Sequence, residues 1–332
     1  ALLSIPFFAL LVSGFAPLTA SKRALALIPQ QTIEALTSSE SSLNQVLAVF
    51  VEEISKPAGL ILLLCGLGAA IYVGRHALRL PKIGRERMYV VLILTFFSML
   101  FWAFFEQAGS SINNFTDRNV DRVGETSYIT QEMVGRTIEI QPTQEQLGYT
   151  NGDDLFTLGN LDDLREAQGD DPNFTIQWTV APDNVGMGLA DRLGETPAST
   201  YQAVNPAYIL IFGLVFTVLW GFLGARGREP STPFKFALGL LQLGLGFGAV
   251  WYGAQHADAR GMVALHWLFL AYLLHTTGEL CLSPVGLSMV TKLSPGFLVS
   301  TVMGTWFLAT AFSQYLAAII SQFTGVGEGG DG

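Results

Sequence analysis

The apolar run HWLFLAYLLHTTGELCLSP at residues 266–284 carries three side chains that could do acid–base chemistry, His266, His275 and Glu279. Glu279 is the costliest of them, because an acid at the centre of a membrane costs about 2.5 to 3.5 kcal/mol. Burial favours the neutral form of a carboxyl group, so such an acid can bind and release a proton. The alternative is that Glu279 lies at the wet edge of the apolar layer and is simply hydrated.

His275 lies one helical turn before Glu279, so the two side chains share a helix face. A histidine and a glutamate at this spacing could also form half of a zinc site, but no other ligand cluster accompanies them. The chain has only 2 cysteines, Cys65 and Cys281, and each lies in an apolar run. We therefore expect neither a metal site nor a disulfide framework.

A second acid, Glu106, closes the apolar run FFSMLFWAFFEQ at residues 96–107. Trp102 lies one turn earlier, which places an aromatic wall beside the carboxylate. This pair could equally be an interfacial tryptophan next to an exposed glutamate.

Polar and aromatic residues also occur in two further apolar runs. Trp306 lies inside its run with Thr310 one turn later, where it could pack or contact a ligand. Asn205 precedes Pro206, and this order is also a natural helix start. Small or helix-interrupting residues are typical both of helices that move and of tight helix contacts; they are Gly239, Gly244, Gly246, Gly248, Pro284 and Gly286.

The elements that carry these side chains are long apolar runs. The 332 residues are 50% hydrophobic and only 14% charged, whereas a soluble domain carries about 25% charged residues. Runs of about 18 residues or more with little or no charge predict membrane-spanning helices. Such runs occupy residues 1–20, 57–74, 88–105, 206–224, 236–255, 262–283 and 297–321. The sequence predicts an all-α membrane protein with about seven membrane helices.

Charge is distributed unevenly and predicts the orientation. Residues 115–200 hold 16 acidic side chains against 5 arginines, while the rest of the chain holds 11 acids and 13 bases. Basic residues collect in the short loops 75–87, with five, and 225–235, with three. Cytoplasmic loops are enriched in such residues, so residues 115–200 are expected on the extracytoplasmic side. No concentrated basic face exists that would suit nucleic acid.

The acidic block 115–200 should fold into a small mixed lobe. The strings RTIEIQP at residues 136–142 and FTIQWTVAP at 174–182 are typical of strands. Its acids could bind calcium, but no stretch follows the order of an EF-hand loop, and solvated surface is the simpler interpretation.

Three strings resemble one family. FWAFFEQAGSS at residues 101–111, AVNPAYIL at 203–210 and LLHTTGELCLSPVGLSMVTKLSP at 273–295 are similar to the proton-dependent oligopeptide transporter (POT or PTR) family of the major facilitator superfamily. The resemblance implies part of a major facilitator type helix bundle. Residues 1–87 would hold two linker helices and a basic cytoplasmic loop. Residues 88–114 and 201–325 would form helices seven to eleven of the carboxy-terminal bundle, 115–200 an acidic insertion, and 326–332 a truncated loop.

By this resemblance, individual residues receive roles. Glu279 would engage the amino group of a peptide and take part in proton coupling, with Asn205 near the same amino group. Glu106 would pair with the amino-terminal bundle and help to gate the outer side. The central cavity would be shaped by aromatic and hydroxyl groups at Trp102, Trp306 and Thr310.

The implied function is proton-coupled symport of di- and tripeptides across the inner, cytoplasmic membrane by a multi-pass protein. The proton is the coupling ion and no cofactor is expected. The partners would be peptides, protons, the lipid bilayer and an amino-terminal bundle of the same transporter. The alternative is a family member that carries another small solute, such as nitrate.

Two further observations limit this interpretation. The family's E-x-x-E-R-F signature and a twelfth helix are absent from this sequence, and both chain ends look like truncations. An enzyme is not expected, because no HExxH string and no serine, histidine and acid arrangement can be assembled from the spacing.

Overall fold

The computed structural model describes residues 9–10, 13, 26–38, 42–169, 171 and 173–324. Six helical stretches in this part of the chain are long and apolar enough to cross a membrane: Pro57–Arg79, Lys82–Asn119, Ala198–Ala225, Thr232–Gln255, His266–Leu293 and Val299–Phe323. They coincide with six of the predicted runs. The seventh, residues 1–20, lies almost entirely outside the described residues. The predicted all-α membrane architecture is therefore confirmed.

The chain forms two compact units. Unit 1 comprises Ala1–Gln107, Pro230–Leu238 and Cys281–Thr324, and unit 2 comprises Ala108–Glu229, Gly239–Leu280 and Gly325–Gly332. Two long helices, α9 (Thr232–Gln255) and α10 (His266–Leu293), contribute residues to both.

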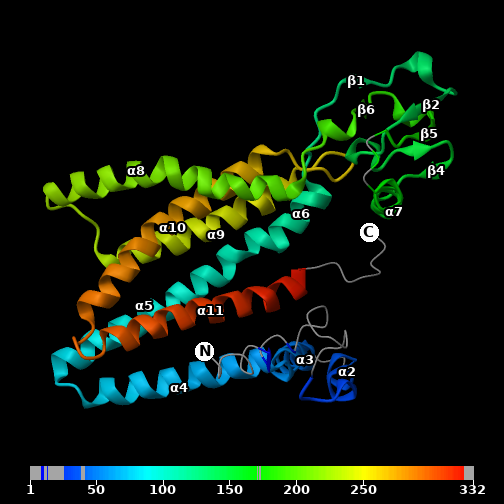
Figure 1. Ribbon diagram of the computed structural model, residues 1–332. Helices are drawn as coiled ribbons and strands as arrows, with labels where there is room; N and C mark the ends of the chain where they lie inside the picture. The colour runs from blue at the N-terminus through cyan, green and yellow to red at the C-terminus, as the bar shows by residue number, and fades with distance from the viewer. Residues whose placement is uncertain are drawn as a thin grey trace. The chain divides into compact units, whose positions relative to one another are not determined.

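Unit 1 is built on three long helices. Helix α11 (Val299–Thr324) packs against α4 (Pro57–Arg79) and α5 (Lys82–Phe105), as Figure 1 shows. The packing of α11 on α4 depends on a glycine. Gly66 has no side chain, and a Cβ at that position would overlap the Phe312 ring. The shorter helices α2 (Gln30–Thr37) and α3 (Ser42–Ser55) precede α4.

Unit 2 contains α6 (Ser111–Asn119) and α8 (Val204–Ala225), and η7 (Ala198–Ala203) leads directly into α8. Helix α8 buries no residue, and its apolar side chains are largely exposed, with Leu210 at 76% and Leu214 at 73%. A helix this apolar and this exposed requires an apolar surrounding, as a membrane provides. The predicted run ends at residue 283, but helix α10 continues to Leu293 and contains Pro284 in its interior.

Between α6 and α8, residues 120–197 form a lobe of short strands, turns and one helix (Figure 1). The two predicted strands are confirmed and pair with each other, β2 (Thr137–Ile140) antiparallel to β5 (Ile176–Thr179). Two further antiparallel pairs are β1 (Ser127–Tyr128) with β6 (Gly188–Leu189) and β3 (Thr150–Asn151) with β4 (Asp154–Leu155). The remaining elements are η2 (Glu106–Gly109) before α6, and within the lobe η3 (Gln131–Met133), η4 (Gln144–Gln146), α7 (Leu158–Gln168), η5 (Pro182–Asn184) and η6 (Arg192–Gly194).

The loop between α9 and α10 is part of the lobe. The lobe core is centred on the fully buried Trp178, and it includes Met262 of this loop, which is 5% exposed. Backbone hydrogen bonds join the same segments, from Val263 N–H to the Asn119 carbonyl at 2.6 Å and from Asp121 N–H to the Val263 carbonyl at 2.9 Å. The lobe is thereby fixed to the start of α10 as well as to its own chain neighbours.

A buried ion pair strengthens this connection. Arg260 of the loop donates from Nη1 to Oε2 of Glu145 at 3.2 Å, and Glu145 is only 3% exposed. The carboxylates of Asp121, Glu125 and Glu145 lie within 4.8 Å of one another. Burial, followed by repulsion from Asp121 and Glu125, raises the pKa of Glu145 above its ordinary value of 4.5, although the charge of Arg260 opposes the shift.

The stability of the lobe should therefore depend on Glu145 and pH. The folded state binds this proton more tightly than the unfolded chain, so the contribution is fully present below pH 4.5. This contribution to the free energy of unfolding is lost as pH rises from the ordinary pKa to the raised pKa. The loss is about 1.4 kcal/mol for each pH unit between the two. Thermal unfolding of the purified protein, measured at several pH values between about 4 and 8, should show this fall in the free energy of unfolding. Glu145→Gln should remove it, whereas Glu132→Gln, at an exposed lobe position, should leave it intact; equal slopes in all three proteins would refute the assignment.

Candidate functional site

The start of α8 and the middle of α10 meet through three polar side chains. Asn205 donates from Nδ2 to the Thr276 hydroxyl at 3.0 Å and to Oε2 of Glu279 at 3.4 Å. The Thr276 hydroxyl in turn donates to the Tyr272 carbonyl at 2.7 Å. An amide and a carboxylate, both partly buried, are thus held side by side within an apolar bundle.

Asn205 does not cap its helix. The residue at the N-cap of α8 is Ala203, and no side chain bonds the first turn. With Pro206 in that turn, one of the N–H groups that a cap would satisfy is missing. The Asn205 side chain is instead available to contact α10.

The contact between α9 and α10 in unit 2 depends on two glycines. A Cβ at Gly278 would lie 2.8 Å from the Gly239 carbonyl oxygen, and a Cβ at Gly246 would overlap the His275 ring. His275 is 1% exposed and lies beside Phe247, with ring centroids 4.9 Å apart. These glycines therefore make close helix contacts, and they allow α10 to bring Glu279 to its position.

Trp102 and Glu106 lie at the end of α5 in unit 1, both partly buried. The Trp102 ring packs edge-on against Phe101 and Phe105, at centroid distances of 5.7 and 5.2 Å. Glu106 follows the last residue of α5, where its N–H bonds the Trp102 carbonyl. The Trp102 ring therefore packs against its own helix neighbours, one turn before Glu106.

Trp306 and Thr310 lie on α11, also in unit 1. Trp306 is 6% exposed, and a Cβ at Gly286 would lie 2.6 Å from its ring and 3.0 Å from the Phe236 ring. Trp306 therefore packs in the interior of the unit. Thr310 is partly buried and donates its hydroxyl to the Trp306 carbonyl at 3.3 Å.

The structure thus brings Asn205 and Glu279 into contact, whereas Trp102, Glu106, Trp306 and Thr310 belong to unit 1. Two polar side chains were missed from the sequence. Thr276 is fully buried between Asn205 and the α10 backbone, and Gln107 ties the end of α5 to α11 by donating to the Ala317 carbonyl at 3.1 Å. Their closeness in sequence to an acid could have identified both residues, since Thr276 lies three positions before Glu279 and Gln107 directly follows Glu106.

Comparison with known proteins gives consistent matches. A family model described as the POT family matches residues 187–329. Dipeptide and tripeptide permease B of Salmonella typhimurium is 27% identical over 273 residues, which are 82% of this chain and 42% of that protein. The uncharacterized transporter YclF of Bacillus subtilis is 41% identical over 147 residues, covering 44% of this chain and 29% of that protein.

A solved structure extends the likeness to the fold. The crystal structure of peptide transporter POT in complex with sulfate matches at a TM-score of 0.51 and 25% identity, over 90% of this chain and 48% of that one. This chain therefore spans about half the length of the proteins it matches, in agreement with the partial bundle predicted from its sequence. The family match over residues 187–329, the shared fold and the six candidate spans show that this chain is a helical membrane protein similar to POT family transporters over about half of their length.

Proposed function

We propose that this chain is the carboxy-terminal part of a symporter that carries di- and tripeptides with protons across the cytoplasmic membrane. The observation that carries the proposal is the contact between Asn205 and Glu279 inside the apolar bundle. A carboxylate attracts an ammonium group, and the Asn205 amide oxygen can accept from the same group. Family relatives named as dipeptide and tripeptide permeases support the substrate class.

Glu279 has the properties required for proton coupling. Its carboxylate lies on a membrane-spanning helix among apolar neighbours, where the charged form is costly without a cation. A proton and a peptide ammonium group each remove that cost, so the same acid can respond to both. In the proposed cycle a proton from the outside loads Glu279, peptide binding then permits the change of conformation, and release of both on the inside resets the cycle, so the two move in the same direction.

For the remaining predicted residues, all in unit 1, we propose the roles that the family resemblance implies. Trp102, Trp306 and Thr310 shape the cavity, and Glu106 contributes to the outer gate. The cation that the peptide carboxylate requires is proposed to come from the amino-terminal bundle of the same transporter. The lobe is proposed to face the extracytoplasmic side, because the basic loops 75–87 and 225–235 favour the cytoplasm.

Uptake tests this function directly. The protein, expressed from its complete gene and reconstituted into proteoliposomes, should accumulate labelled dialanine when the lumen is alkaline relative to the outside. Collapse of the gradient with a protonophore should stop accumulation, and unlabelled trialanine should compete. Correctly inserted protein that accumulates nitrate but no peptide would replace this proposal with the alternative, another small solute.

A further inference from the structure

A cavity of about 460 Å³ opens at the base of the lobe in unit 2. Its wall is formed by α6, α7, the chain before η7 and η7 itself, and it carries charges of both signs on Asp117, Arg122, Arg165 and Glu195. Small-molecule sites in proteins have volumes of about 300 to 1,000 Å³ and a few well-placed polar groups. This cavity lies within that range.

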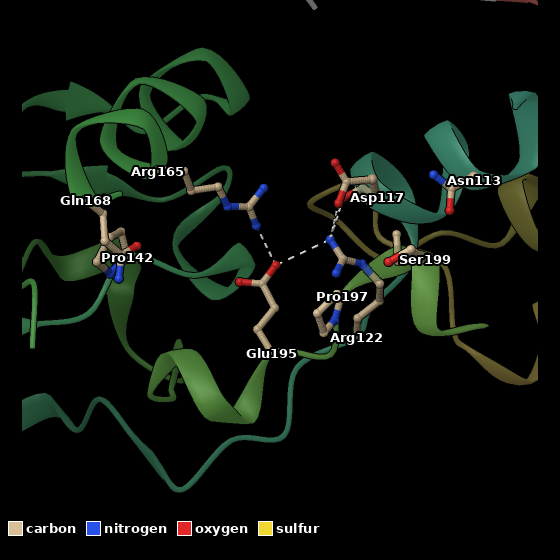
Figure 2. A pocket seen from close by; sticks show the side chains of 10 residues that line it. Asn113, Asp117, Arg122, Pro142, Arg165, Gln168, Glu195, Pro197 and Ser199 are labelled. Carbon is tan, nitrogen blue, oxygen red and sulfur yellow. Dashed lines mark hydrogen bonds and ion pairs between the residues drawn. The ribbon is translucent and has the colours of Figure 1, made fainter. Parts of the chain in front are cut away.

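The four charges form one chain of ion pairs, which Figure 2 shows. Arg165 Nη2 lies 2.5 Å from Glu195 Oε1, the same oxygen lies 3.3 Å from Arg122 Nη2, and this nitrogen lies 2.8 Å from Asp117 Oδ1. The two central residues are the most buried, with side-chain exposures of 2% for Arg122 and 10% for Glu195.

The central pair has a structural role. Arg122 also donates to the carbonyls of Thr116 at 3.0 Å, Thr196 at 2.5 Å and Asp117 at 2.9 Å, so all three of its nitrogens are engaged. Glu195 bridges the two arginines. This pair fixes the positions of the outer members of the chain.

The outer members keep binding capacity. Asp117 has a 47% exposed side chain, and its Oδ2 has no partner among the described residues. Arg165 is 29% exposed and forms its hydrogen bond through Nη2, while Nη1 lies 3.7 Å from the exposed Asp162. Figure 2 shows the charged ends of Arg165 and Asp117 turned toward one another across the central pair.

The separation of these two groups suits a short zwitterion. The three ion-pair distances limit the gap between Arg165 Nη2 and Asp117 Oδ1 to about 9 Å, and two extended residues span about 7 Å. The length of a dipeptide lies within this upper limit, so its ammonium group would pair with Asp117 and its carboxylate with Arg165. A solute with only one charge would contact one end alone.

The cavity also lies close to the Asn205 site along a continuous helical stretch. Ser199 of the cavity wall belongs to η7, which continues into α8 and reaches Asn205 six positions later. At a rise of 1.5 to 2 Å per residue, this is about 10 Å.

We propose that this cavity is a second peptide site, which receives a di- or tripeptide by its two termini before the peptide passes to Asn205 and Glu279. The assignment of the ligand rests on the proposed function. Arg165 and Asp117 are the binding residues, and Arg122 and Glu195 are positioning residues.

Site-specific alkylation measures occupancy of this cavity alone. In the complete protein, Ser199→Cys places a thiol in the cavity wall, and mass spectrometry reads its reaction with an impermeant maleimide separately from Cys65 and Cys281. Dialanine should slow this reaction, and it should not slow the reaction at Ser127→Cys, which is exposed on β1 outside the cavity. Protection should persist when Glu279→Gln is added, because the two sites bind independently.

Variants of the two binding residues decide the assignment. Arg165→Gln and Asp117→Asn should each raise the dialanine concentration needed for half protection by about tenfold, because each removes one charge-assisted hydrogen bond. Arg165→Lys should retain protection, and so should Arg136→Gln, a matched control on the exposed lobe surface. No protection at millimolar dialanine, or equal protection in Arg165→Gln and Arg136→Gln, would overturn the proposal.

Uptake by the same preparation separates this inference from the proposed function. Gradient-driven uptake without protection at residue 199 would refute the second site and leave the symport proposal standing. Protection without uptake would refute the symport proposal and leave the second site standing.

Discussion

Replacing Glu279 by glutamine is expected to lower the affinity for dialanine by about tenfold and to abolish stimulation of uptake by a proton gradient. Glutamine has nearly the same shape and can still accept from Asn205, so the helices should stay in place. What it loses is the negative charge for the peptide ammonium group and the ability to carry a proton. Loss of a hydrogen bond to a charged group costs about 1.5 kcal/mol at the low end of the usual range, and this corresponds to the expected tenfold change.

The measurement is initial dialanine uptake into proteoliposomes at several external pH values, with binding followed separately by calorimetry. Glu86→Gln is the matched control, because it removes an exposed carboxylate from the first turns of α5. If Glu279→Gln retained the pH dependence of the parent protein, the coupling role of Glu279 would be wrong.

The second large effect is expected from Gly278→Ala. The new Cβ would lie 2.8 Å from the Gly239 carbonyl oxygen, a backbone atom that cannot rotate away. Helices α9 and α10 would have to separate next to Glu279. Overpacking of this kind costs about 1 to 3 kcal/mol, and displacement of Glu279 from Asn205 should lower uptake as well.

Gly248→Ala on α9 provides the control, since no atom lies within 4 Å of the Cβ built there. Alanine is a better helix former than glycine by about 1 kcal/mol, so this variant should unfold at the parent temperature or slightly above. Thermal unfolding in detergent and uptake in proteoliposomes are both required. A Gly278→Ala protein that equals Gly248→Ala in both measurements would show that the close contact is not needed.

Much of the fold could be predicted from the sequence because hydropathy acts over long windows. The apolar runs at residues 57–74 and 206–224 became α4 and α8, and the alternating strings around Ile138 and Trp178 became a pair of strands. The extension of α10 past Pro284 was not predicted, since a proline inside a helix usually ends or bends it. Nor did composition reveal that the α9–α10 loop enters the lobe core.

The candidate site, too, could be predicted from the sequence only in part. The cost of a buried acid selected Glu279 from the sequence, and the family resemblance added Asn205, but only the structure shows Thr276 between them. From the sequence, the glycines could mark either helices that move or tight helix contacts. The structure shows that Gly246 and Gly286 are close packing contacts, whereas Gly244 and Gly248 meet no atom within 4 Å. Periodicity cannot make this distinction, because it depends on which side chain a neighbouring helix places opposite each glycine.

The docking of the α9–α10 loop into the lobe has a consequence for engineering. A simple excision of the lobe, residues 120–197, would uncover Met262, now 5% exposed, and would leave Arg260 without the Glu145 carboxylate. A version of the protein without the lobe therefore needs a polar residue in place of Met262 and a shorter loop lacking Arg260, designed together with the deletion. The lobe and the loop therefore form one packing unit, and exchange of one of them alone would yield a mismatched core.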